Sequence, residues 1–232
     1  MQKLTTGVKE VAQLHVDGRI LSIKQTRLPG SRVTVLLVDI PEFSARDGNP
    51  YCGPDGADWF DNHKRFYLFA KAAELIALDQ AKLEWRPTIV HCNDWQTGLI
   101  PALLSLHPER PATVFTIHNL AYRGLFPYQA FEELQLPSGF WHHERIEFYG
   151  QMSFMKGGLA FADFITTVSP SYANEIQQPE FGCGLDGLMR YRSDSLAGIL
   201  NGIDMDEWNP GSDAHISVNF NRRTLGNKVK NK

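Results

Sequence analysis

Four short apolar segments of this chain each end in polar residues that can bind a sugar or a phosphate. They cover residues 88–92, 113–117, 164–168 and 196–200. An apolar run bounded by turn residues is typical of a strand buried on both faces, as in a parallel sheet. Ligands of open parallel sheets bind beyond the carboxyl ends of the strands. The polar residues that follow the four segments therefore predict one shared binding site.

The segments before and between these strands favour helices. Residues 61–79 carry apolar side chains at spacings of three and four residues, which predicts a helix with one apolar face. Further helices are expected over 96–106, 149–162 and 170–177, and a short one ends near Tyr191. Strands that alternate with helices predict an α/β fold with a doubly wound parallel sheet.

Three other stretches complete the expected organisation. Residues 19–24 and 32–40 are strand-like and are separated by a Pro-Gly turn, so they predict a hairpin or two neighbouring strands. Residues 41–58 are rich in Pro, Gly, Asp and Asn and predict a long loop, a kind of segment that is often functional. Short helices and loops are expected over 120–147.

The charge balance and the cysteines exclude several classes of protein. The net charge is −3, from 23 basic and 26 acidic residues, so neither nucleic acid nor an anionic membrane surface is an expected partner. No uncharged apolar run is long enough for a transmembrane helix, and the first residues do not resemble a signal peptide. Three widely spaced cysteines favour a reducing compartment, and the histidines lack metal-ligand spacing.

The pair Asp94-Trp95 directly follows the first apolar segment and has two interpretations. A carboxylate beside an indole suits a sugar site, because the acid accepts hydrogen bonds from hydroxyls and the ring covers the sugar's CH groups. Alternatively, Asp94 caps the next helix and Trp95 belongs to the core. The residues alone leave both interpretations open.

Two further polar pairs follow the second and fourth segments. His118-Asn119 precedes a turn with Tyr122 and Arg123, although a histidine after a strand is more often structural than catalytic. Asn201-Gly202 is by itself best explained as a turn.

Taken in order, several stretches resemble the family of bacterial glycogen synthases and plant starch synthases. The most specific are HNLAYRG at 118–124, TTVSPSYA at 166–173 and LNGID at 200–204. Further similar stretches are 38–43, 47–51, 91–98 and 155–159.

The resemblance implies a GT-B fold, of which this chain would be the N-terminal, Rossmann-like half. It also implies transfer of glucose from ADP-glucose to the non-reducing end of an α-1,4-glucan, with retention and without a metal or cofactor. The location implied is the cytoplasm of a bacterium, or a plastid if the source is a plant. Oligomeric state is not implied.

The resemblance also assigns roles to residues. His118 and Asp94 would be catalytic, with His118 at the donor glucose, where it would stabilise developing positive charge. Asn201 would bond a hydroxyl of that glucose. The acceptor glucan would contact Tyr51, Asp94, Trp95 and Asn119.

The resemblance predicts a domain over 1–210 that lacks the family's first strand and its Lys-Thr-Gly-Gly loop. Residues 211–232 would be a linker and the start of a C-terminal domain, so we expect a fragment truncated at both ends and inactive alone. Two alternatives stay open. The chain could be a non-catalytic glucan-binding module or remnant, or it could belong to a relative that uses UDP-glucose.

Overall fold

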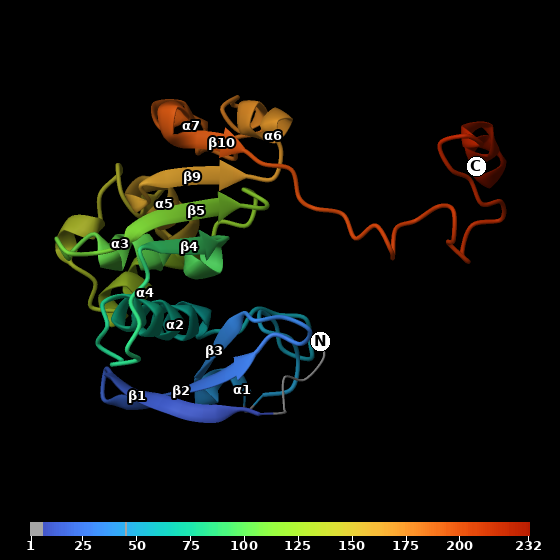
Figure 1. The fold of residues 1–232 in the computed structure, drawn as a ribbon. Helices are drawn as coiled ribbons and strands as arrows, with labels where there is room; N and C mark the ends of the chain where they lie inside the picture. Colours follow the sequence, from blue (N-terminus) through green and yellow to red (C-terminus); the bar gives the residue numbers. More distant parts are fainter. Residues whose placement is uncertain (1–6, 45) are drawn as a thin grey trace. The chain divides into compact units, whose positions relative to one another are not determined.

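The computed structural model describes residues 7–44 and 46–232, which form two compact units (Figure 1). The first unit ends at Ile199 and contains the sheets and the long helix. The second unit, Leu200–Lys232, contains turns and the short 3-10 helix η4 (Leu225–Asn231). The domain boundary after residue 210 stays a prediction.

A four-stranded parallel sheet lies at the centre of the first unit. Its strands are β4 (Ile89–Asn93), β5 (Ala112–Ile117), β9 (Phe164–Thr167) and β10 (Leu196–Gly198). Their order is β10-β9-β5-β4 and every neighbouring pair is parallel, so their carboxyl ends share one edge (Figure 1). The predicted α/β class with a Rossmann-like parallel sheet is confirmed.

The strands differ in burial according to their place in the sheet. The central strands β5 and β9 are mostly buried, as predicted. The prediction that each strand is buried on both faces was wrong for β4 and β10. In β4 the Ile89 side chain is exposed and Val90 half-buried, and all of β10 is half-buried. These strands lie at the two sides of the described sheet and have one strand neighbour each.

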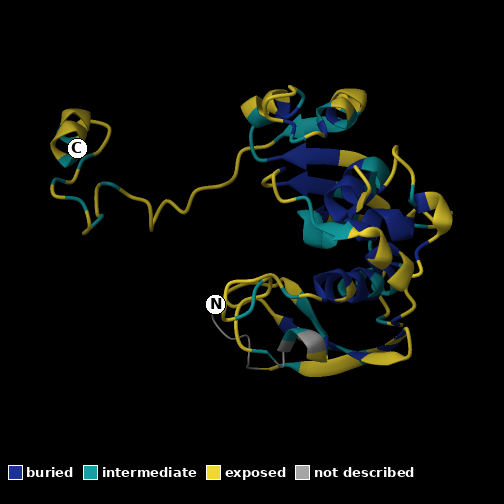
Figure 2. Ribbon diagram, turned by 180° about the vertical axis from the view of Figure 1, so that it is seen from behind, coloured by how far each residue is buried: buried dark blue, intermediate teal, exposed yellow. Residues whose placement is uncertain are grey.

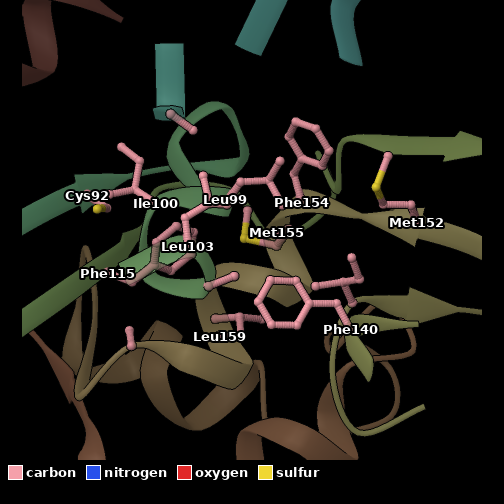
Figure 3. Close-up of a cluster of buried hydrophobic side chains, with 14 of the residues drawn as sticks. Cys92, Leu99, Ile100, Leu103, Phe115, Phe140, Met152, Phe154, Met155 and Leu159 are labelled. Carbon is pink, nitrogen blue, oxygen red and sulfur yellow. The ribbon is translucent and has the colours of Figure 1, made fainter. Parts of the chain in front are cut away.

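Helices α3 (Leu99–Leu104) and α5 (Phe154–Phe161) build the main core with the sheet. Buried side chains from both helices surround Phe115 of β5 (Figure 3). A Cβ on Gly158 of α5 would lie 2.4 Å from the Phe115 ring, so this glycine allows the helix to approach the sheet closely. Figure 2 shows that the buried residues gather in these elements and that the loops are mainly exposed.

Helix α2 (Asn62–Ala77) has two buried faces, whereas the sequence predicted one. Phe66 and Ala70 belong to the main core, and Leu68 and Ala72 belong to a second one. The second core is completed by an antiparallel sheet of β1 (Lys9–Val16), β2 (Arg19–Arg27) and β3 (Thr34–Asp39). The prediction that the last two strands are neighbours is confirmed, whereas β1 was not predicted.

Two predicted helices proved to be interrupted. In place of one helix over residues 96–106, the structure has the 3-10 helix η1 (Trp95–Thr97) and, after Gly98, helix α3. A Cβ on Gly98 would lie 1.9 Å from the Phe154 carbonyl oxygen, so the chain bends where it contacts α5. Residues 149–162 begin with a strand, β8 (Gln151–Ser153), and α5 starts only after Ser153, whose hydroxyl accepts a hydrogen bond from the Lys156 N–H.

The remaining elements are short. Strand β8 pairs with β6 (Leu125–Pro127) and β7 (Glu147–Phe148) in a small antiparallel sheet. The predicted loop 41–58 starts with a one-turn helix, α1 (Pro41–Ser44). The other helices are α4 (Tyr128–Glu133), η2 (Ser138–Phe140), α6 (Pro170–Glu175), α7 (Asp186–Tyr191) and η3 (Ser193–Ser195). Within the described ranges, no helix has the length and apolar character needed to cross a bilayer.

Candidate functional site

Asp94 joins the ends of two neighbouring strands. It follows β4, and its Oδ1 accepts a hydrogen bond of 2.9 Å from the backbone N–H of His118, which follows β5. The Asp94 N–H in turn donates to the Thr116 carbonyl oxygen at 2.9 Å. The interpretation of Asp94 as a helix cap was wrong, because its side chain makes no capping hydrogen bond to η1. The carboxylate instead fixes the segment that carries His118.

The backbone of Asp94 is in a strained conformation. Its φ of 57° and ψ of 177° lie in a region that is essentially restricted to glycine. Such a conformation costs on the order of 1–3 kcal/mol and persists only where the surrounding structure imposes it. The bonds to Thr116 and His118 provide that constraint here. Strain of this kind clusters at active sites and ligand clamps, so the conformation marks this turn as a functional candidate.

The imidazole of His118 is held by Asn93. Its Nε2 lies 3.0 Å from the Asn93 Oδ1 at the end of β4. An amide oxygen only accepts, so Nε2 is the donor in this contact. Asn93 was not predicted as a site residue, although its place at the end of a predicted strand was a usable signal.

An open groove of about 800 Å³ lies beside these strand ends. Two segments distant in sequence line it, one around residues 51–62 and the other around 121–126, together with residues 94–96. Tyr51, Asp94 and Trp95 are all in its lining, so the structure brings three of the four predicted acceptor residues together. Trp59 and Phe60 also line the groove and were not predicted, although two adjacent aromatic residues after a polar loop were a visible signal.

The loop that carries Tyr51 is stabilised by hydrogen bonds. Asn49 Oδ1 accepts from the Tyr51 N–H at 2.7 Å and from the Cys52 N–H at 2.8 Å. The Tyr51 carbonyl oxygen accepts from Asn62 Nδ2 at 2.9 Å and from the Trp59 N–H at 3.0 Å. These bonds hold the Tyr51 ring 6.4 Å from the Trp95 ring.

Trp95 is half-buried, so its interpretation as a core residue holds in part, and its role in binding a sugar stays a prediction. One part of the ring packs on the core, with Phe66 at 4.8 Å in an edge-to-face arrangement and Phe126 at 6.1 Å. The residue also lines the groove. Gly124, with φ of 56°, lies so close that a Cβ there would be 2.4 Å from the indole. The indole therefore has a fixed position.

The other predicted residues lie differently. Asn119 is exposed at the same sheet edge but is not in the groove lining; its Oδ1 accepts from the Ala121 N–H at 3.0 Å and shapes the turn. The Tyr172 hydroxyl accepts from the next N–H, that of Leu120, at 3.0 Å. Asn201 belongs to the second unit, so its role at a donor glucose stays a prediction.

Asp58, one of the acids that line the groove, accepts a hydrogen bond from the thiol of Cys52. Cys52 donates its thiol hydrogen to Asp58 Oδ1 at 3.3 Å, and this hydrogen bond raises the thiol pKa. The thiol is therefore a poor nucleophile at neutral pH. Among the described residues, no group of three His, Cys, Asp or Glu side chains could hold a metal ion.

The fold and the site together define an α/β domain that carries a ligand groove at the carboxyl edge of its parallel sheet. The family model for the starch synthase catalytic domain matches residues 1–191, and the chain belongs to this family. The resemblance seen in the sequence is thereby confirmed.

Relatives and a solved structure agree with this assignment. The chain is 76% identical over 226 residues to the glycogen synthase of Cellvibrio japonicus, covering 97% of this chain and 47% of that protein. It is 55% identical to the glycogen synthase of Thioalkalivibrio sulfidiphilus, and the match covers 92% of this chain and 44% of that protein. The catalytic domain of starch synthase IV from Arabidopsis thaliana, bound to ADP and acarbose, matches with a TM-score of 0.73 and 27% identity, over 97% of this chain and 46% of that chain. The chain therefore spans about half the length of these relatives.

Proposed function

We propose that this chain is the acceptor-binding half of a glycogen synthase. In the whole protein, glucose passes from ADP-glucose to the non-reducing end of an α-1,4-glucan with retention of configuration. The relatives' names and the ADP and acarbose in the starch synthase IV structure support this proposal.

The observation that carries the proposal is the pairing of Asp94 with His118 beside a groove that Tyr51 and Trp95 line. Aromatic faces pack against the CH groups of a sugar, and a carboxylate accepts hydrogen bonds from its hydroxyls. Asn119 would contact the same acceptor from the adjoining turn.

His118 would act on the donor glucose. Departure of ADP leaves positive charge at the anomeric carbon, and a fixed dipole aimed at that carbon stabilises the charge without reorganising. The bonds from Asn93 to the ring and from Asp94 to the backbone supply that fixation. Asn201 would bond a hydroxyl of the same glucose, and no metal or cofactor takes part.

We place the protein in the bacterial cytoplasm, because both glycogen synthases named above come from bacteria. We also assign residues 1–210 to the N-terminal domain and residues 211–232 to the linker and the start of the C-terminal domain.

A transfer assay on a full-length protein that contains this chain tests the proposal. Radiolabelled ADP-glucose is expected to label glycogen, with UDP-glucose a much poorer donor. A preference for UDP-glucose would contradict the choice of donor. Glycogen binding without transfer from either nucleotide sugar would instead identify a non-catalytic glucan-binding protein.

A further inference from the structure

The groove exposes two aromatic side chains to which the proposed chemistry gives no role. Phe60 is 84% exposed and Tyr122 is 66% exposed, and both line the groove that holds Tyr51 and Trp95. Phe60 precedes α2 and Tyr122 follows β5, so two separate parts of the chain present rings to one groove. Neither ring gains the free energy that burial of an aromatic side chain provides.

The Phe60 side is held by a charged network. The Arg46 guanidinium lies 5.8 Å from the Phe60 ring centroid and 4.9 Å from that of Trp59. Asp61 fixes this guanidinium through two hydrogen bonds of 2.7 and 2.6 Å. The turn is closed by the Asn62 N–H, which donates to the Trp59 carbonyl oxygen at 3.1 Å. Phe60 is therefore exposed and restrained at the same time.

The Tyr122 side is held by its own turn. The Tyr122 N–H donates to the Asn119 carbonyl oxygen at 3.3 Å, and Asn119 Oδ1 accepts from the Ala121 N–H. Two residues further on, Gly124 contacts the Trp95 indole. These bonds order the backbone that carries Tyr122 in the folded chain, which lowers the cost of binding a ligand there.

We propose that Phe60 and Tyr122 bind further glucose units of a linear α-glucan, beyond the unit held at Tyr51 and Trp95. This inference rests on the proposed function, which makes an α-glucan the acceptor. A groove of about 800 Å³ has the size of clefts that hold ligands larger than a monosaccharide. Its lining combines aromatic rings with Asp58, Asp94 and Arg123, so it matches an uncharged polyhydroxylated chain better than a phosphate-bearing polymer. The groove therefore selects acceptors of several glucose units.

Calorimetric titration of the 232-residue chain with maltose, maltotriose and maltoheptaose tests the inference. Affinity should rise with length in the unchanged chain. Phe60→Ala and Tyr122→Ala should each weaken maltoheptaose binding about five- to tenfold and maltose binding less than about twofold. Phe60→Tyr and Tyr122→Phe, which keep the rings, should retain the length dependence. Tyr149→Ala removes a ring that is 82% exposed and lies outside the groove lining, and it should change nothing.

Each other outcome has a definite meaning. Equal weakening for maltose and maltoheptaose, or no weakening, overturns the inference and leaves the proposed function intact. The same holds if the unchanged chain binds all three sugars equally. If the unchanged chain binds none of them, the acceptor role of the groove fails as well, and the inference falls with it. Thermal melting of each variant by circular dichroism checks that the fold is retained.

Discussion

The carboxylate of Asp94 accepts a hydrogen bond from the backbone N–H of His118, at 2.9 Å, across the ends of two neighbouring parallel strands. This contact explains why two short motifs that lie 24 residues apart form one site. It also accounts for the strained backbone of Asp94, because the carboxylate reaches the His118 N–H from that conformation.

The strain at Asp94 predicts an unusual order of stability for two substitutions. Asp94→Gly and Asp94→Ala both remove the hydrogen bond, but only glycine relaxes at a φ of 57°. We expect the glycine variant to be more stable by about 1 kcal/mol in urea unfolding of the chain. At Asp39, in strand β3, the alanine variant should be the more stable one. If the same variant, glycine or alanine, were the more stable one at both positions, the backbone strain at Asp94 would be contradicted.

The contact between Gly124 and Trp95 predicts a steric effect on the groove. Gly124→Ala would place a methyl group 2.4 Å from the indole, so we expect a loss of about 1–3 kcal/mol of stability beyond the backbone cost. Gly150→Ala is the matched control, since its φ is also positive and nothing lies within 4 Å of its Cβ position. Urea unfolding, followed by tryptophan fluorescence, compares the two. Equal losses would show that the indole is not fixed by Gly124.

Asp163 predicts a loss of stability in acid. Two hydrogen bonds from Arg110 and one from the Thr113 N–H lower the pKa of this carboxyl from 3.8 to about 2. A lowered pKa in the folded state stabilises the fold above pH 3.8, and that contribution is lost as the pH falls towards 2. Because the side chain is 43% exposed, we expect only about 1 kcal/mol.

The variant Asp163→Asn isolates this effect. Its free energy of unfolding should be lower than that of the unchanged chain at pH 6, and the difference should shrink between pH 4 and pH 2. Unfolding in urea across this range provides the measurement. If the difference in unfolding free energy stayed constant with pH, the Asp163 carboxylate would not be the cause of the loss of stability in acid.

The fixed imidazole predicts a defect in rate rather than in acceptor binding. In a full-length protein containing this chain, His118→Ala should lower kcat by about 10²–10³-fold and leave the KM for glycogen within about twofold. Asn93→Ala leaves the imidazole in place but unheld, so a smaller loss, about tenfold, is expected. Steady-state kinetics at saturating ADP-glucose separates the two constants. Similar small changes in both constants would contradict the place assigned to His118.

The parallel sheet was predictable because its strands are short apolar runs ended by turn residues. The site was partly predictable for the same reason, since Asp94 and His118 directly follow such runs. Strand β1 was not predictable in this way, because KEVAQLHV lies at the side of its sheet, has mostly exposed residues and contains no continuous apolar run. Strands of two or three residues, such as β7 and β8, are too short to show a periodic pattern.

The groove was less visible in the sequence than the strand ends. It depends on the loop around Asn49 and on the turn before Gly124, and hydrogen bonds of individual side chains fix both. Composition shows that such segments are loops but does not show which surface they face. Phe60 was missed for this reason, and Asn93 was missed although it directly precedes Asp94, which was selected from the sequence.

A crystal structure of the chain with bound maltoheptaose tests the central claim most directly. We predict glucose rings packed on Tyr51 and Trp95, with a sugar hydroxyl within hydrogen-bonding distance of the Asp94 carboxylate. Ordered sugar found only outside this groove, with Tyr51 and Trp95 free of it, would contradict the account.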